Sequence, residues 1–276
     1  MSAQKIVRIS NDLVRCVQKL KISEKRLLML VVSKATDDTV NDLIPITAVE
    51  YADFYSVDLK SCYRTMRAAH ERLWERSFDI GDTKYRWVIT CRYADGEGRI
   101  LVRIHPDIQQ HISHLKFHYT QYYLRRAGEF KRSSSWRLFE LLMQFRKTGI
   151  LKISVSEFKE VLEVPQSYNE HFALIRHKVI IPALKEIKAA GLPVKLKTEK
   201  KGRSIHMLIF TFPLEQQSDW VANAAQQISG ANSKQRITKK QIEKHAKPGE
   251  SYSEAQERLQ RELDNQQKEV QHQKSA

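Results

Sequence analysis

The sequence predicts an α+β fold in which one order of elements occurs twice: strand, capped helix, turn, basic helix and β-hairpin. The two copies lie at residues 43–104 and 151–212, and they share an architecture rather than particular residues. A helix that can enter a DNA groove, followed by a hairpin whose cations can bind phosphates, forms a winged-helix domain. We therefore predict two tandem winged-helix domains, at residues 6–125 and 126–213.

A change of composition marks the end of the second predicted domain. Beyond residue 212, Gln, Ser, Lys and Glu dominate and large apolar residues become scarce. Such a segment cannot bury enough apolar surface to offset the entropy of ordering. We expect residues 214–276 to form a polar, largely disordered tail, which contains at most a solvated or partner-induced helix.

Capping residues and apolar periodicity place the elements of the first predicted domain. Four N-caps are expected, each followed by a helix: Asn11, Ser23, Thr47 and Asp58. The first of these helices is expected to run through Leu20, and a brief strand at residues 43–46 precedes the third. The fourth helix buries a stripe made of Leu59, Cys62, Met66, Ala69 and Leu73. Three strands are expected to follow, at residues 77–80, 85–93 and 99–104.

The second predicted domain opens with a helix from Ser133 and continues with a strand at residues 151–153. Ser154 and Glu157 have the spacing of a capping box, as Thr47 and Glu50 do in the first domain. The helix after Ser154 is expected to end near Leu162.

A basic helix and a hairpin complete the second predicted domain. The apolar residues of this helix recur at spacings of three and four and form one arc for a core: Phe172, Ile175, Val179 and Ala183. Pro182 is expected to bend or loosen the helix. The hairpin turn is expected at residues 199–203, where Gly202 can supply a positive φ.

Three groups of residues are candidates for DNA contact. They are Arg176, His177 and Lys178 on the second basic helix, Lys200, Lys201 and Arg203 in the hairpin, and Lys60, Arg64 and Arg67 on the first basic helix. Arg suits bidentate hydrogen bonding to guanine, whereas Lys mostly contacts phosphate, so we assign base contact to Arg176. The alternative is that the hairpin cations only keep an edge strand soluble and that the first basic helix presents a solvated face.

The net charge indicates a polyanionic partner. A formal charge of +15 and a pI near 9.7 exceed what solubility requires, and nucleic acid is the leading candidate. A membrane is the competing polyanion, but no apolar run reaches the roughly 18–20 residues that span a bilayer. The N-terminus lacks the apolar segment of a signal peptide, so we expect a cytoplasmic protein. Three cysteines without metal-type spacing, Cys16, Cys62 and Cys91, are expected to be reduced thiols.

Enzymatic chemistry is not indicated, and we expect no cofactor, metal or catalytic residue. His111, His114 and His118 would share one face of a helix, but a fourth metal ligand is not evident. Tyr122 and Tyr123 suggest a rolling-circle nickase with a tyrosine nucleophile, yet no histidine pair forms the His-apolar-His metal motif of such enzymes. Paired tyrosines at this position are expected to belong to an interdomain core. A Gly-rich loop for a nucleoside triphosphate is also absent from the sequence.

Eight short segments in a specific order and spacing suggest a family. They are Asn11-Asp12-Leu13, Ser23-Glu24-Lys25-Arg26-Leu27-Leu28, Tyr51-Ala52, Ser135-Trp136-Arg137-Leu138-Phe139-Glu140-Leu141-Leu142, Pro165-Gln166-Ser167-Tyr168, Ile181-Pro182-Ala183-Leu184-Lys185-Glu186-Ile187, Lys200-Lys201-Gly202-Arg203 and Leu208-Ile209-Phe210. Together they resemble the iteron-binding plasmid replication initiators (Rep), tandem winged-helix proteins, over residues 6–213.

The resemblance implies a division of labour between the two domains. The second would bind directly repeated double-stranded origin sites through the helix that holds Arg176, His177 and Lys178, and the first would contact adjacent DNA and form a dimer interface. A monomer would start replication and a dimer would repress its own promoter. The host replication initiator and replicative helicase would be recruited after an AT-rich segment opens. Two features depart from the relatives. One is His177, which lies in a triplet that is often all Arg or Lys, and the other is the long polar tail.

A dimeric winged-helix transcriptional repressor is the alternative function. It would bind an inverted repeat as a stable dimer, without origin melting or helicase contact. The residues alone separate this function poorly from that of an initiator, and the family resemblance favours the initiator.

Overall fold

Side-chain caps fix where the helices of the first winged helix begin, since each accepts a free N–H group of the first helical turn. The computed structural model describes residues 5–39, 41–94, 96–168 and 171–214. In it, Thr47 Oγ1 accepts from Glu50 N at 3.0 Å and Asp58 Oδ2 from Ser61 N at 2.9 Å, so both predicted caps are confirmed. The helices of this region are α1 (Asn11–Arg15), α2 (Ile22–Lys34), α3 (Ala48–Tyr55), α4 (Leu59–Glu75), α5 (Pro106–Gln109) and α6 (Leu124–Gly128).

Two of the predicted caps are wrong. Ser10 caps α1, because its Oγ accepts from Leu13 N at 3.2 Å, and the helix ends at Arg15 rather than Leu20. Ser23 lies inside α2, whose first turn is closed by the Glu24 carboxylate accepting from the backbone of residue 21. In both cases a neighbouring acceptor competes with the predicted one, which spacing alone does not reveal.

Antiparallel strands complete the first winged helix: β1 (Ile6–Ser10), β2 (Ile44–Thr47), β3 (Ser77–Ile80), β4 (Thr83–Arg86), β5 (Val88–Ala94), β6 (Arg99–Ile104) and β7 (Tyr119–Tyr123). One sheet has the order β2-β6-β5, while β3 pairs with β4. The single strand predicted at residues 85–93 is wrong: the chain divides at Trp87, which is buried 4.2 Å from the Phe78 ring centroid. The two halves then pair with different neighbours.

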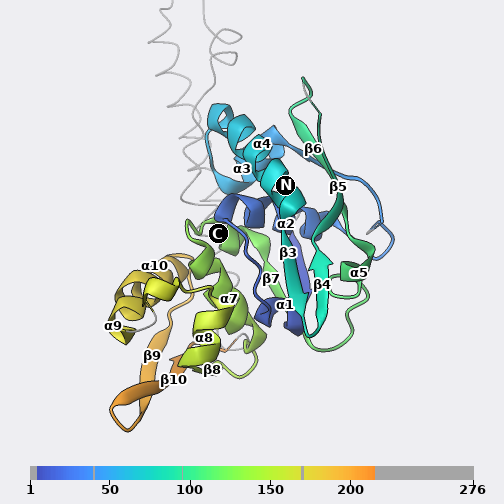
Figure 1. Cartoon of the computed structure of the whole chain (residues 1–276). Coiled ribbons are helices and arrows are strands. Elements are labelled where there is room, and N and C mark those ends of the chain that lie inside the picture. The colour runs from blue at the N-terminus through green and yellow to red at the C-terminus, as the bar shows by residue number, and fades with distance from the viewer. Residues whose placement is uncertain (1–4, 40, 95, 169–170, 215–276) are drawn as a thin grey trace, which may run out of the picture. The chain divides into compact units, whose positions relative to one another are not determined.

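The rest of the described chain follows the predicted order of elements. They are α7 (Ser133–Gln144), β8 (Ile150–Ser154), α8 (Val155–Val161), the 3-10 turn η1 (Gln166–Tyr168), α9 (Phe172–Ile175), the π-helical turn η2 (Arg176–Ile180), α10 (Ile181–Ala189), β9 (Lys195–Lys201) and β10 (Ser204–Thr211). Ser154 Oγ accepts from Glu157 N at 3.1 Å, which confirms that cap. The sheet order is β8-β10-β9, so that β9 is an edge strand (Figure 1). Except for residue 214, the predicted tail lies outside the described residues.

An antiparallel pair that the sequence pattern did not predict joins the start of the chain to residues near 120. β1 pairs with β7, with Ile6 opposite Tyr123 and Ser10 opposite Tyr119. The side chain of Tyr122 is buried and that of Tyr123 is half-buried, while the location of this pair between two domains stays a prediction. The Tyr122 hydroxyl donates to Glu140 at 2.8 Å and accepts from Trp136 Nε1 at 3.0 Å, so β7 is fixed to α7.

The buried Glu24 carboxylate holds the end of α4 against the start of α2. It accepts from Arg72 Nε at 2.6 Å and from Arg76 Nε at 2.8 Å. Burial alone would raise the pKa of Glu24, but hydrogen bonds from Arg76, the backbone N–H of Lys21 and Arg72 outweigh burial and lower this pKa below its ordinary value of 4.5. The ionised form is therefore the one that stabilises the fold.

We expect Glu24→Gln to destabilise the protein most at neutral pH. Because the folded-state pKa is depressed, the contribution of Glu24 is present above pH 4.5 and is lost as pH falls through the folded-state pKa. Urea denaturation of wild type and variant between pH 7 and pH 3 should show a stability difference that shrinks below about pH 4.5. Glu71→Gln, at an exposed position on α4, is the control. A Glu24→Gln difference that stays constant across this range would contradict the assignment.

Candidate nucleic-acid interface

The helix of residues 172–189, here the recognition helix, consists of α9, η2 and α10. Ile175, Val179 and Ala183 are buried and Phe172 is partly buried, so the predicted apolar arc is confirmed. Arg176, His177 and Lys178 are all exposed, and among the described residues none of them has an ion-pair partner. The core face and the cationic face of this helix are therefore separate.

Pro182 accounts for the π-helical turn in the middle of the recognition helix. Proline has no N–H to donate, and in a regular α-helix its ring would clash with the carbonyl of residue 178. The helix instead includes one extra residue in this turn, and the N–H of Ile181 donates to the Arg176 carbonyl, five residues back. The predicted loosening thus takes the form of a π turn, and that turn contains Arg176, His177 and Lys178.

The hairpin of residues 195–211, here the wing, comprises β9, β10 and their connection. β9 extends through Lys201, so the turn is only Gly202 and Arg203 rather than residues 199–203. Gly202 has a φ of +63°, in the left-handed region as predicted. Lys200, Lys201 and Arg203 are exposed at this tip, which Figure 1 shows as the orange hairpin beside α9 and α10.

Two further lysines of the wing belong to the same cationic surface. Lys195 and Lys197 are exposed on the edge strand β9. The alternation of apolar and basic residues at 194–197 was the sequence signal for their exposure, although they were not among the predicted site residues. Glu199 lies on the same strand, and its carboxylate is 3.0 Å from Lys152 Nζ. Its negative charge reduces the positive charge of this surface.

The first basic helix, α4, presents the other predicted cations. Lys60, Arg64 and Arg67 are exposed along it, opposite the buried stripe. The Arg67 guanidinium lies 4.8 Å from the ring centroid of Tyr93 on β5, which positions it beside the hairpin of β5 and β6. Leu59 departs from the predicted stripe, since it is exposed at the first helical position.

Polar contacts join the two winged helices beside residues 16–19. Glu163 Oε1 accepts from the backbone N–H groups of Gln18 at 2.8 Å and Lys19 at 2.7 Å. Arg137 donates to the carbonyls of Cys16 at 2.6 Å and Val161 at 3.2 Å. Because the buried Arg137 side chain has acceptors on both sides, these contacts hold residues 16–19 against the end of α8.

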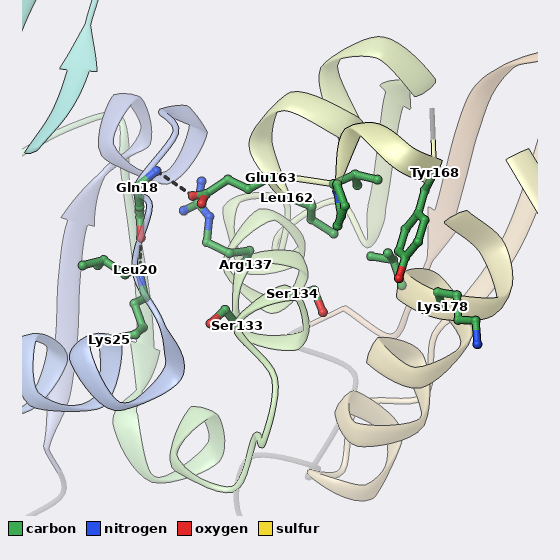
Figure 2. Close-up of a pocket in the computed structure, with 13 residues that line it drawn as sticks. Gln18, Leu20, Lys25, Ser133, Ser134, Arg137, Leu162, Glu163, Tyr168 and Lys178 are labelled. Carbon is green, nitrogen blue, oxygen red and sulfur yellow. Dashed lines mark hydrogen bonds between the residues drawn. The ribbon is translucent and has the colours of Figure 1, made fainter. Parts of the chain in front are cut away.

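A pocket of about 280 Å³ lies at this joint, between residues 18–25, the first turns of α7 and residues 162–168 (Figure 2). Tyr168 and Lys178 line its outer side, and Figure 2 shows the Lys178 ammonium directed away from Arg137. The buried Arg137 side chain is already satisfied by protein acceptors. The Lys178 ammonium at the rim therefore faces solvent rather than the joint.

Burial affects the three cysteines and Tyr122, one of the two tyrosines considered as a nucleophile. Burial raises the pKa of Cys16 and Cys62 to about 11 and that of Cys91 to about 12, so their thiols stay protonated near neutral pH. Burial also raises the pKa of Tyr122 well above 10, and its hydroxyl is enclosed by Glu140 and Trp136. A nucleophile must reach its substrate, and this hydroxyl does not.

The three histidines at residues 111–118 do not share one face of a helix. The helix α5 ends at Gln109, and the following residues form turns, with His114 and His118 both at positive φ. His111 contacts Ser10 Oγ at 2.9 Å, whereas His114 faces Asp37. Among the described residues, no group of three or more His, Cys, Asp or Glu side chains could hold a metal ion.

Within the part of the chain that the structure describes, no helix is both long and apolar enough to span a bilayer.

Comparison with known proteins decides the family. A family model described as "Initiator Replication protein, WH1" matches residues 6–143, and a second, "Initiator Rep protein, WH2", matches residues 154–212. The chain belongs to the Rep initiator family. The predicted fold class of two tandem winged helices is thereby confirmed, while the domain boundary that we predict after residue 125 stays a prediction.

This Rep initiator is similar to two proteins of Escherichia coli. One is a replication initiation protein, 24% identical over 189 residues that make up 64% of the chain and 58% of that protein. The match therefore spans less than two thirds of that relative. The other is an uncharacterized 27.6 kDa protein, 22% identical over 225 residues, or 74% of the chain and 93% of the relative.

A solved structure shares the fold of this Rep initiator. It is the Pi initiator protein in complex with iteron DNA, which has a TM-score of 0.69 and 19% sequence identity. The match covers 78% of the chain and 100% of the chain in that structure. The tandem winged-helix arrangement is thus maintained although few residues are shared.

Proposed function

We propose that this Rep initiator starts plasmid replication by binding direct repeats, or iterons, in the duplex DNA of the origin. The second winged helix would bind the repeat through the recognition helix and the wing. The first winged helix would contact adjacent DNA through α4. Plasmid origins lie in the bacterial cytoplasm, which is where we propose that the protein acts.

The observation that supports this proposal most strongly is the pairing of two cationic elements in one winged helix. Arg176, His177 and Lys178 are exposed on the recognition helix, and Lys200, Lys201 and Arg203 are exposed on the wing. A helix in the major groove with a wing on the flanking backbone places base contacts and phosphate contacts side by side. The iteron DNA in the complex of the Pi initiator is consistent with this mode of binding.

Further steps of initiation would come after the repeats are bound. Occupied repeats would promote opening of AT-rich DNA and recruit the host replication initiator and helicase. The opening would draw on binding energy rather than on hydrolysis by this chain, so the proposal includes no catalytic residue, cofactor or metal. A dimer would repress the protein's own promoter, and the monomer would start replication.

Footprinting on the plasmid's own origin and promoter, with permanganate probing for unpaired thymines, tests the proposal. We expect protection of phased direct repeats together with unpaired thymines in the neighbouring AT-rich DNA. Protection of a single inverted repeat without unpairing would instead indicate a dimeric repressor. Repeating the titration across salt concentrations checks for phosphate contacts, because each contributes about 0.9 to the slope of log K against log salt on duplex DNA.

A further inference from the structure

Two large aliphatic side chains of the recognition helix project into solvent. Leu174 is 36% exposed and Ile181 is 44% exposed, although Ile175 and Ile180 beside them are fully buried. A single exposed aliphatic residue is ordinary on a protein surface. Two exposed aliphatic residues on the helix that the proposed function places in a DNA groove suggest a contact with the DNA itself.

Their neighbours on the helix surface are cationic. Lys185 lies four residues after Ile181 within the regular helix α10, so these two exposed side chains share one side of it. Arg176 and Lys178 are exposed on the π turn η2 between Leu174 and Ile181. The two aliphatic side chains are therefore surrounded by groups that favour a polyanion, which argues against an apolar protein surface as their partner.

The major groove of DNA displays both charged and apolar groups, as this surface of the helix does. Phosphates line its edges, and the C5-methyl group of thymine is the apolar group that it displays. We propose that Leu174 and Ile181 contact thymine methyl groups in the origin repeats and so select T·A base pairs at two positions. This inference rests on the proposed function, because it assumes that the recognition helix enters the groove of the repeat.

The π-helical turn η2 lies between the two aliphatic residues. Leu174 precedes the turn within α9, and Ile181 is the first residue of α10. The Ile181 N–H is held by the Arg176 carbonyl across the turn, and the Pro182 ring follows it. The backbone that presents Ile181 is thus held in place before binding, which lowers the entropic cost of a contact made by its side chain.

Replacing thymine by deoxyuridine tests the inference, because this change removes only the C5-methyl group. Full-length wild type, Leu174→Ala and Ile181→Ala would be titrated with duplexes of the plasmid's own origin repeat that contain thymine or deoxyuridine. For wild type we expect binding to weaken about fourfold per contacted methyl group, which corresponds to about 0.8 kcal/mol. Each variant should lose the sensitivity at one thymine position and retain it at the other.

Matched controls use aliphatic residues of similar exposure away from the recognition helix. Leu43→Ala, at 37% exposure before β2, is the control for Leu174, and Ile150→Ala, at 52% exposure on β8, is the control for Ile181. Both controls should keep the wild-type sensitivity to deoxyuridine. Replacement by alanine at an exposed helical position preserves helix propensity, so the variants should fold.

The outcomes separate this inference from the proposed function. If wild type binds origin repeats and random duplex equally, the proposed function fails. If it prefers origin repeats but binds the deoxyuridine duplex with unchanged affinity, only the methyl contact is overturned. Variants that keep full sensitivity would overturn the assignment to Leu174 and Ile181. Loss of self-association in these variants, with sensitivity retained, would instead assign the two residues to a contact between copies.

Discussion

Glu140→Gln is expected to lower the free energy of unfolding by about 3–5 kcal/mol. The Glu140 carboxylate is fully buried, and it lies 2.8 Å from Lys25 Nζ and 3.3 Å from an Arg137 nitrogen. Burial lowers the pKa of Lys25, although the neighbouring Glu140 acts in the opposite direction. An uncharged amide would leave two buried cations without an anion, which is the costly way to break an ion pair.

Urea denaturation of two further variants tests whether the charge is the cause. Glu199→Gln removes an exposed partner of Lys152 and should change the free energy of unfolding by less than about 0.5 kcal/mol. Adding Lys25→Met to Glu140→Gln removes one of the unpaired cations and should recover part of the loss. A double variant less stable than Glu140→Gln alone would show that packing of the Lys25 stem, rather than its charge, dominates.

Arg176→Ala is expected to reduce the preference for origin repeats over random duplex by about 1–3 kcal/mol, or roughly 5- to 150-fold. The reason is that guanidinium can donate two parallel hydrogen bonds to one guanine, and the loss of such a contact affects the specific complex alone. Fluorescence titrations with both duplexes, at one salt concentration, measure the two affinities. An equal fall in both affinities would remove Arg176 from the base-contacting residues.

Lys178→Ala is the comparison variant, since Lys178 follows Arg176 within the same π turn. A phosphate contact has no sequence preference, so both affinities should weaken together and the salt slope should fall by about 0.9. Results in which Arg176→Ala and Lys178→Ala behave identically would mean that neither residue distinguishes bases. The pair therefore separates base contact from phosphate contact within one turn of helix.

Local signals predicted most of the fold. The caps at Thr47, Asp58 and Ser154 and the apolar stripe from Cys62 to Leu73 are properties of a few neighbouring residues, and the structure confirms them. The pairing of β1 with β7 joins residues more than 100 positions apart. Nothing in the spacing within either strand specifies such a partner, because register depends on which faces the rest of the fold buries.

The cationic residues of the candidate site could be predicted from the sequence, but their geometry could not. Exposure of Arg176, His177 and Lys178 follows from the apolar arc, which leaves these residues outside it. A regular helix of 3.6 residues per turn does not contain the extra residue of η2, so the position of Ile181 relative to Leu174 could not be derived from spacing. Glu140 was also unpredictable as a site of stability, because its three partners come from α2, α7 and β7.

The lysines of β9 have a second consequence, for the solubility of the protein itself. An edge strand has one row of unpaired backbone groups, and these can pair with the same strand of another molecule. Lys195, Lys197, Lys200 and Lys201 place like charges along that edge, so two free copies repel each other there. In the proposed complex, phosphates that neutralise these lysines would also remove the repulsion. Protection against aggregation would therefore be strongest when no DNA is bound.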